Sequence, residues 1–277
     1  MPELPELEII CEVLTRRVVG RKIASAEVAP KGGPIIIRNL INLKFEETLT
    51  GKRVISASRR GKYILLNLDP ERIILAINPK LTGRLQLAQP GAKKAGPVHI
   101  TFHFSDPDEE LRYVDQKKMG QVYLTHDLSL IPMFDKLGPE ALEIAREEFR
   151  SRLRAYRGEI KGILTRGSFI AGIGNAYADE ILWSARLHPY RKRPSLEQQE
   201  VDRLYDALRA VLHEAIQEIR GRMGDEIHRK PRDFFAVHMK HGEGCPRCST
   251  RISLITANQR ITNFCRTCQP GGLFRGM

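Results

Sequence analysis

The sequence predicts an α+β protein in three parts: an N-terminal antiparallel β-sandwich with an N-terminal helix, a helical helix–two-turn–helix domain, and a C-terminal zinc-finger β-hairpin with four cysteine ligands. Three observations predict this. One helical segment precedes a series of short β-type runs, helical spacing returns near residue 138, and four cysteines cluster near the end of the chain. The predicted domains cover residues 1–131, 132–232 and 233–277, the last including a flexible tail.

The charge balance limits the class of partner. The 277 residues contain 45 Lys and Arg against 33 Asp and Glu, a net charge of +12. This excess favours a polyanion such as nucleic acid over an acidic membrane surface. No apolar run approaches the roughly 20 residues of a membrane span, and the acidic N-terminus differs from a signal peptide. We therefore expect a cytoplasmic protein with no membrane partner.

Residues 5–19 are predicted to form the first helix. A proline such as Pro5 is tolerated in a first turn, and Glu6 suits the positive end of the helix dipole. The predicted apolar face consists of Leu7, Ile10, Cys11, Leu14 and Val18. We interpret Cys11 as a buried small hydrophobe rather than a nucleophile.

Short β-type runs and then helical segments follow. The β-type runs, which predict an antiparallel sandwich or barrel, are KIASAEVA, RVISASRRGKYILLNL, RIILAIN, HITFHF, LRYVD and GQVYL. After a hinge at residues 131–138, the helical segments are EEFRSRLRAY, EIKGILTRG, NAYADEILWSARL and LEQQEVDRLYDALRAVLHEAIQEIR. The last helix is predicted to begin with a capping box of Ser195 and Gln198 and to end at Gly221.

The cysteines near the C-terminus have the spacing of a metal site. Two C-x-x-C pairs, separated by sixteen residues, comprise Cys245, Cys248, Cys265 and Cys268. Such pairs can close a tetrahedral site for one zinc ion, and four protein ligands leave no position for water, so the zinc is predicted to be structural. Three nearby histidines are expected to contact solvent or phosphate instead: His228, His238 and His241. The finger is also basic, which favours contact with DNA.

The segment IAGIGNAYADE predicts a tight turn before a helix. Gly172 and Gly174 allow the turn, and Asn175 can cap the helix that follows. Backbone N–H groups in such a turn can bind a phosphate. A connection between two helices also needs glycine, so this motif is compatible with a purely structural role.

Three stretches carry a resemblance to a known family. PELPELE, KGILTRGSFIAGIGNAYADEIL and the finger with ANQRITNFCRTC occur in this order between residues 2 and 268. Together they resemble the formamidopyrimidine-DNA glycosylase/endonuclease VIII family. The resemblance implies a bifunctional DNA glycosylase and abasic-site lyase of base excision repair, acting on double-stranded DNA that carries an oxidised base or an abasic site. It also implies a monomer in the bacterial cytoplasm or nucleoid.

The resemblance implies the following catalytic residues. After removal of Met1, the exposed nitrogen of Pro2 is the nucleophile, Glu3 protonates the sugar ring oxygen, and Glu6 is a supporting acid. Lys62 contacts a phosphate beside the lesion. An N-terminal amine suits attack on C1′ because it titrates near ~8, so much of it is neutral at physiological pH. The resulting iminium drives β- and then δ-elimination from a nucleotide turned out of the stack.

The resemblance also implies residues that contact DNA. Lys161 and Asn175 match phosphate-binding positions, Arg260 matches an arginine at the finger tip, and Glu180 has a structural or indirect role. Leu81, Lys117 and Met119 stand where the family uses Met, Arg and Phe to fill the gap left by the flipped nucleotide. Asn78 replaces a histidine, and the loop before the finger is shortened. These departures leave open the preferred lesion and the preferred opposite base.

Two alternative functions fit the sequence less well. A catalytically idle zinc-finger DNA-binding protein on the same scaffold would have no need of Pro2, Glu3 and Glu6. An unrelated zinc-ribbon transcription factor would explain neither the N-terminus nor the sandwich.

Overall fold

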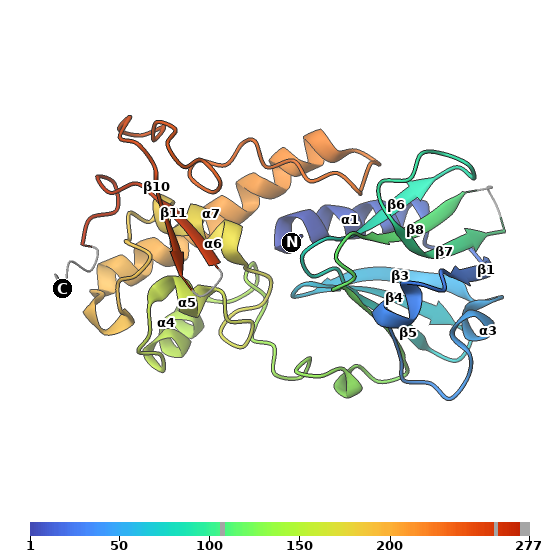
Figure 1. Cartoon of the computed structure of the whole chain (residues 1–277). Helices are drawn as coiled ribbons and strands as arrows, with labels where there is room; N and C mark the ends of the chain where they lie inside the picture. Colours follow the sequence, from blue (N-terminus) through green and yellow to red (C-terminus); the bar gives the residue numbers. More distant parts are fainter. Residues whose placement is uncertain (106–108, 258–259, 272–277) are drawn as a thin grey trace. The chain divides into compact units, whose positions relative to one another are not determined.

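The computed structural model describes residues 1–105, 109–257 and 260–271, without the side chains at 257 and 260. The chain divides into two compact units (Figure 1): Met1–Asp135 with Ile219–Pro231, and Lys136–Glu218 with Arg232–Met277. The sequence assigned residues 219–231 to the helical domain instead, and its three-domain division stays a prediction. Within the described part of the chain, no helix is long and apolar enough to cross a membrane.

The first helix, α1 (Leu4–Arg17), forms where the sequence predicts it. Pro5 lies in its first turn, and the basic Arg16 and Arg17 occupy the last turn, where they complement the negative end of the helix. Arg16 and Arg17 both form ion pairs with Asp225, and Arg220 pairs with Glu12 at 2.6 Å. These contacts explain why residues 219–231 pack with the first unit.

Two β-sheets follow α1 in this unit. One has the strand order β2-β9-β5-β4-β3, and the other has the order β1-β7-β8-β6. The strands are β1 (Ile23–Val28), β2 (Ile37–Asn39), β3 (Arg53–Arg60), β4 (Tyr63–Asp69), β5 (Ile73–Asn78), β6 (Gly83–Ala88), β7 (Val98–Phe104), β8 (Glu110–Asp115) and β9 (Gln121–Thr125). Neighbours pair antiparallel except β2 and β9, which pair parallel over three residues. The predicted α+β class with N-terminal β-sheets is thus confirmed.

Several elements of this unit differ from the prediction. The run predicted over residues 53–68 is a hairpin of β3 and β4, because Gly61 adopts a positive φ of 56° in the turn between them. Short elements that the sequence did not predict are α2 (Gly33–Ile36), β2, α3 (Phe45–Leu49), β6 and the 3-10 turn η1 (Leu128–Leu130). Most of them are too short for a periodic pattern to identify.

The second unit is helical and carries the finger hairpin. Its elements are α4 (Arg146–Arg154), α5 (Ile160–Leu164), α6 (Asn175–Ser184), the 3-10 turn η2 (Arg193–Ser195), α7 (Gln198–Met223), β10 (Ser253–Ala257) and β11 (Arg260–Phe264). The last residues of α7 belong to the first unit. β10 and β11 pair antiparallel, as the finger prediction requires.

The ends of α7 correct the sequence prediction. Ser195 does not cap this helix, because its hydroxyl donates to the Lys192 carbonyl at 2.8 Å; instead, the N–H of Glu197 donates to Glu200 Oε2 at 3.0 Å. The helix continues through Gly221 to Met223, and Gly224 follows with φ +53°. A glycine inside a helix costs only about 1 kcal/mol relative to alanine, which the buried neighbours Ile219 and Met223 can offset.

Candidate functional site

Pro2 lies immediately before α1, and the capping box of that helix organises the chain around it. The N–H of Glu3 donates to Glu6 Oε2 at 2.9 Å, and the Glu3 carboxylate accepts the N–H of Glu6 in return. Glu3 is 2% exposed and Glu6 is 1% exposed. The three N-terminal residues predicted to be catalytic are therefore brought together, with two buried carboxylates held close to Pro2.

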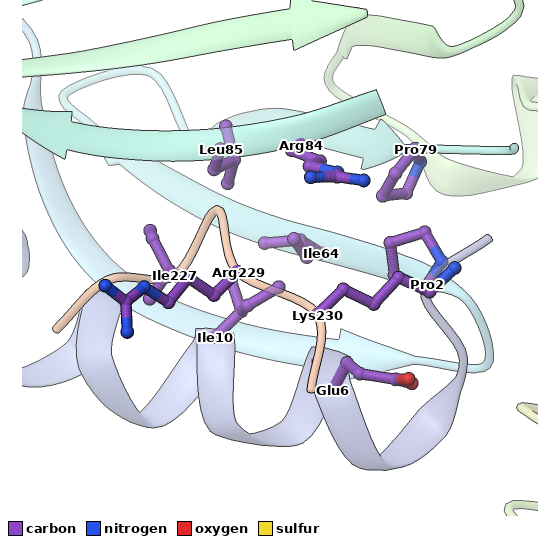
Figure 2. A pocket seen from close by; sticks show the side chains of 10 residues that line it. All are labelled: Pro2, Glu6, Ile10, Ile64, Pro79, Arg84, Leu85, Ile227, Arg229 and Lys230. Atoms are coloured by element: carbon purple, nitrogen blue, oxygen red, sulfur yellow. The ribbon is translucent and has the colours of Figure 1, made fainter. Parts of the chain in front are cut away.

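A pocket lies beside Pro2 (Figure 2). Its lining comprises Pro2, Glu6, Ile10, Ile64, Pro79, Arg84, Leu85, Ile227, Arg229 and Lys230. The residues between 227 and 230 come from the segment after α7, and Arg84 Nη1 donates to the carbonyl of His228 in that segment at 3.3 Å. The sequence did not identify these cations as part of the site, because they lie far from Pro2 along the chain. Cationic side chains around Pro2 favour an anionic substrate there.

Lys62 occupies the turn between β3 and β4 and is half-buried. The preceding Arg59 attaches this turn to α1, because its Nε donates to Glu8 Oε2 at 2.7 Å and its Nη1 donates to the Gly61 carbonyl at 3.1 Å. Ile64, two residues further on, lines the pocket of Pro2. Lys62 is thus held in the same unit as Pro2, and its contact with phosphate stays a prediction.

Leu81, Lys117 and Met119 lie in turns that follow β5 and β8, and all three are exposed. Leu81 exposes 46% and Met119 50% of its surface. Asn78, where the family has histidine, is buried and accepts the N–H of Lys80 through Oδ1 at 3.2 Å. Asn78 therefore shapes the turn that carries Leu81.

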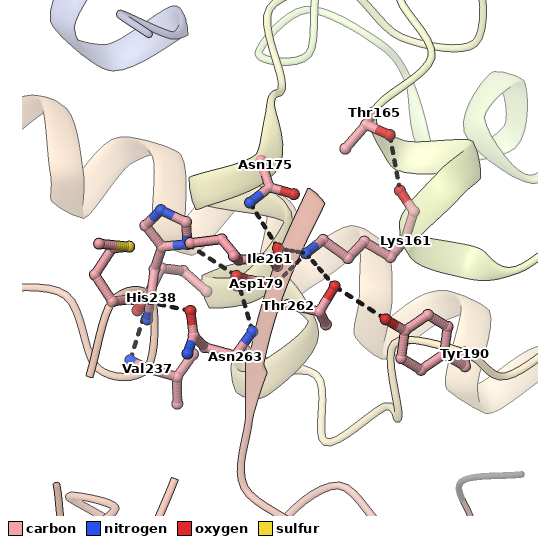
Figure 3. A network of polar contacts seen from close by, with 12 residues as sticks. Lys161, Thr165, Asn175, Asp179, Tyr190, Val237, His238, Ile261, Thr262 and Asn263 are labelled. Carbon is pink, nitrogen blue, oxygen red and sulfur yellow. Dashed lines mark hydrogen bonds and ion pairs between the residues drawn. The ribbon is translucent and has the colours of Figure 1, made fainter. Parts of the chain in front are cut away.

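The prediction that Lys161 binds phosphate needs correction (Figure 3). Its ammonium pairs with Asp179 Oδ1 at 2.6 Å and donates to the Ile261 carbonyl and to Thr262 Oγ1, both at 2.8 Å. An ammonium has three donors, and the residue is 6% exposed. Lys161 therefore joins α5 and α6 to strand β11 of the finger and does not present its charge to a phosphate.

Asn175 contacts the same strand. Its Nδ2 donates to the Ile261 carbonyl at 2.8 Å, the carbonyl that Lys161 also uses. It does not cap α6, because Gly174 occupies the N-cap position. An amide carries two N–H donors, so phosphate binding by Asn175 stays a prediction. The side chain of Arg260 lies outside the described residues.

Two further acids of α6 bind the finger region, and sequence reasoning identified only one. Glu180 accepts the backbone N–H groups of residues 236–238 at 2.8–3.0 Å, which agrees with the structural role considered for it. The missed residue is Asp179, fully buried, whose Oδ2 lies 2.8 Å from His238 Nδ1. His238 is therefore buried against an acid rather than facing solvent or phosphate as expected. The feature of the sequence that could have identified Asp179 is an acidic residue within an otherwise largely apolar helix.

The four predicted metal ligands come together in the finger. The sulfur atoms of Cys245, Cys248, Cys265 and Cys268 all lie within 4.8 Å of one another. The Cys245–Cys268 and Cys248–Cys265 sulfur pairs are 3.8 and 3.4 Å apart. A tetrahedral zinc ion with bonds of about 2.3 Å requires sulfur separations near 3.8 Å, so these distances fit. Trp183 packs against this cluster and donates its Nε1–H to Cys245 Sγ at 3.4 Å.

Three family models match consecutive parts of the chain. They are the formamidopyrimidine-DNA glycosylase N-terminal domain at residues 1–122, the H2TH domain of the same glycosylase at 137–225, and the zinc finger found in FPG and IleRS at 242–271. The last model covers all four cysteines. Together with their sulfur geometry, it identifies the cofactor as one zinc ion held by four thiolates.

Full-length relatives and solved structures agree with these models. The formamidopyrimidine-DNA glycosylases of Pelotomaculum thermopropionicum and Symbiobacterium thermophilum are 35% and 37% identical; the alignments cover 97% and 98% of this chain and 99% and 90% of theirs. Lactococcus lactis Fpg in complex with DNA containing an abasic site is similar with a TM-score of 0.85 and 31% identity, covering 97% of this chain and 100% of that one. MutM in complex with DNA containing carbocyclic 8-oxo-G has a TM-score of 0.84 and 31% identity, covering 98% and 100%. This chain therefore belongs to the formamidopyrimidine-DNA glycosylase family.

Proposed function

We propose that this protein is a bifunctional DNA glycosylase and abasic-site lyase of base excision repair. It excises oxidised bases from duplex DNA through a Schiff base on the N-terminal proline, and it nicks the strand by β,δ-elimination. The observation that carries this proposal is the position of Pro2, beside a pocket whose lining includes Arg84, Arg229 and Lys230 and next to the buried carboxylates of Glu3 and Glu6. Complexes of related proteins with abasic and lesion DNA support the substrate class.

The chemistry begins with removal of Met1, because a proline nitrogen in a peptide bond has no available lone pair. The free secondary amine attacks C1′, and the damaged base leaves with the electron pair of the glycosidic bond. Glu3 protonates the ring oxygen, so the sugar opens to an iminium on Pro2. Loss of a C2′ proton then expels the 3′ phosphate, and a second elimination expels the 5′ phosphate. Glu6 holds the N-terminal turn through the Glu3 N–H.

The remaining proposed contacts place the DNA. Lys62 binds a phosphate beside the lesion, Asn175 and Arg260 bind phosphates elsewhere, and the exposed Leu81, Lys117 and Met119 fill the gap in the stack. The net charge of +12 supports a large salt-dependent contribution to affinity. Lys161 acts indirectly by holding strand β11.

Borohydride trapping tests the proposal. The protein without Met1 is incubated with duplexes that carry an abasic site, 8-oxoguanine, a formamidopyrimidine or an oxidised pyrimidine, and is then reduced. We expect a covalent adduct at Pro2, a drop of at least about tenfold for Pro2→Gly, and background trapping when Met1 is retained. The panel also ranks the lesions.

Pro34→Gly is the matched control, since Pro34 is an exposed proline in the first turn of α2 in the same unit. It should trap like wild type. Undiminished trapping by both Pro2→Gly and the Met1-retaining chain would sink the assignment. A wild type that binds duplex DNA but forms no adduct would instead favour the catalytically idle binder on the same scaffold.

A further inference from the structure

Two apolar side chains project from neighbouring turns of the first unit among basic residues. Leu81 is 46% exposed and Met119 is 50% exposed, and Lys117 and Lys118 beside Met119 are exposed too. Exposed apolar side chains flanked by cations suit a partner with an anionic exterior and an apolar interior, which describes stacked bases behind phosphates. We call Leu81, Lys117 and Met119 the wedge.

A single buried carboxylate connects the two turns of the wedge. Asp115, at the end of β8, is 1% exposed. It accepts the hydroxyl of Thr82, next to Leu81, and it accepts the N–H of Lys117 at 3.1 Å and the N–H of Gly120 at 2.7 Å. The Lys117 N–H also reaches Thr82 Oγ1 at 3.0 Å, so both turns share one hydrogen-bond centre.

The backbone around Asp115 is fixed as well. Its N–H donates to the Pro97 carbonyl at 3.1 Å, and its carbonyl lies 2.8 Å from the Nε2 of His99. Asp115 pairs with Gly83 across β8 and β6, which places the carboxylate between the turns.

Two glycines allow the turns to approach this centre closely. A Cβ on Gly120 would lie 1.7 Å from the Tyr113 hydroxyl and 3.0 Å from Asp115 Oδ2, and a Cβ on Gly83 would lie 2.2 Å from the same hydroxyl. The packing therefore leaves no room for a side chain at either position, so glycine is what lets both turns approach this centre.

We propose that Asp115 is a positioning residue that holds the Leu81 turn and the Lys117–Met119 turn as one rigid unit, so that the wedge enters the duplex as a whole. This rests on the proposed function only in that the wedge is taken to fill the gap in DNA. Loops that are ordered before binding lose less conformational entropy on binding, so loosening the two turns should weaken engagement of duplex without disturbing the chemistry at Pro2.

The Asp115→Asn variant tests this proposal, because the amide nitrogen of asparagine would face one of the groups that now donate a hydrogen bond to the carboxylate. The first measurement compares excision from a lesion duplex with borohydride trapping on a single-stranded abasic oligonucleotide, which has no gap to fill. We expect duplex excision to fall by about tenfold or more and single-strand trapping to stay within about twofold of wild type. Asp127→Asn is the control, since Asp127 accepts Ser129 in another turn of the same unit, and it should change neither.

The second measurement needs no catalysis. Affinity for a duplex with a stable abasic analogue is measured for Leu81→Ala, Met119→Ala and the double variant. If the wedge acts as a unit, the loss of affinity in the double variant should be smaller than the product of the two single losses, by about threefold or more. This coupling between Leu81 and Met119 should disappear in the Asp115→Asn background. Thr82→Val should also reduce this coupling, because it removes the hydroxyl that donates to Asp115 while leaving the buried carboxylate in place.

The outcomes separate this inference from the proposed function. A wild type without a Pro2 adduct overturns the proposed function, while the coupling between Leu81 and Met119 still judges the role of Asp115. The inference would be overturned if Asp115→Asn lowered duplex excision and single-strand trapping equally, or if it left duplex excision unchanged. It would also be overturned if the coupling between Leu81 and Met119 persisted in both the Asp115→Asn and the Thr82→Val backgrounds.

Discussion

Leu81 and Met119 in the first unit expose about half of their surface, whereas Lys161 in the second exposes 6%, although all three were predicted to contact DNA. The wedge consists of side chains that point outward from turns, supported beneath by the carboxylate of Asp115. In the second unit, the polar groups of Lys161 and Asp179 are used within the protein, where they hold strand β11. One region is therefore organised to touch its partner, and the other is organised to place the finger.

Among the changes that test this difference between the two units, removal of the metal should have the largest effect on duplex binding. Structural zinc contributes an apparent binding free energy of about 10–16 kcal/mol in isolated fingers, so chelation or Cys265→Ser should unfold the hairpin and release Ile261 and Thr262 from Lys161. We expect metal loss and no measurable duplex binding, while the N-terminal unit stays folded by circular dichroism. Trp183, the single tryptophan, should report the change by fluorescence because it bonds to Cys245.

Cys11→Ala serves as the control for cysteine substitution. Cys11 is buried in α1, so its replacement should leave the metal content unchanged. Duplex affinity that survives metal loss would mean that the finger is not part of the binding surface.

Lys161→Met should have the next largest effect, because it leaves the fully buried carboxylate of Asp179 without its lysine. Breaking one side of a buried ion pair costs about 3–5 kcal/mol, which thermal unfolding would detect. The salt dependence of duplex binding should keep its slope, since no phosphate contact is lost.

The Lys62→Met variant should give the opposite result to Lys161→Met, because Lys62 is predicted to bind a phosphate. The slope of log affinity against log salt should become less steep by about 0.9, with a smaller change in stability. The corrected role of Lys161 would be wrong if Lys161→Met lowered the slope in this way without lowering the melting temperature.

Lys117→Arg should have the smallest effect on stability and a selective effect on function. Lysine offers a point charge, whereas arginine offers a planar fork that can read a base with two hydrogen bonds. A good bidentate contact contributes about 1–3 kcal/mol of discrimination, or roughly 5- to 150-fold. We expect wild type to prefer cytosine over adenine opposite the lesion only weakly, and Lys117→Arg to strengthen that preference.

Single-turnover excision from matched duplexes measures this preference. Lys118→Arg is the control, because it makes the same change one residue away in the same turn. Strong discrimination by wild type, with no change in Lys117→Arg, would show that residue 117 does not read the opposite base.

Much of the architecture could be predicted where neighbouring residues decide it. The apolar face of α1, the antiparallel pairing of β10 and β11 and the cysteine cluster all depend on spacing within a few residues or on one hairpin, so a local pattern is sufficient. The capping of α7 was predicted wrongly because the Ser195 hydroxyl donates to the Lys192 carbonyl, while Glu200 accepts the N–H of Glu197 at the start of the helix; the sequence pattern alone does not show which of these bonds forms.

The sequence by itself determined which residues can bind zinc and that the partner is anionic, because these follow from residue types, their spacing and net charge. The role of Pro2 as nucleophile comes from the family resemblance and stays a prediction. Only the tertiary structure decided which charged side chains face outward. Lys161 and Lys117 look alike in sequence, but Lys161 meets Thr262 from 101 residues away and Asp179 from another helix. A buried charge must be paired because leaving water is costly, and whether a partner is present depends on segments that only folding brings together.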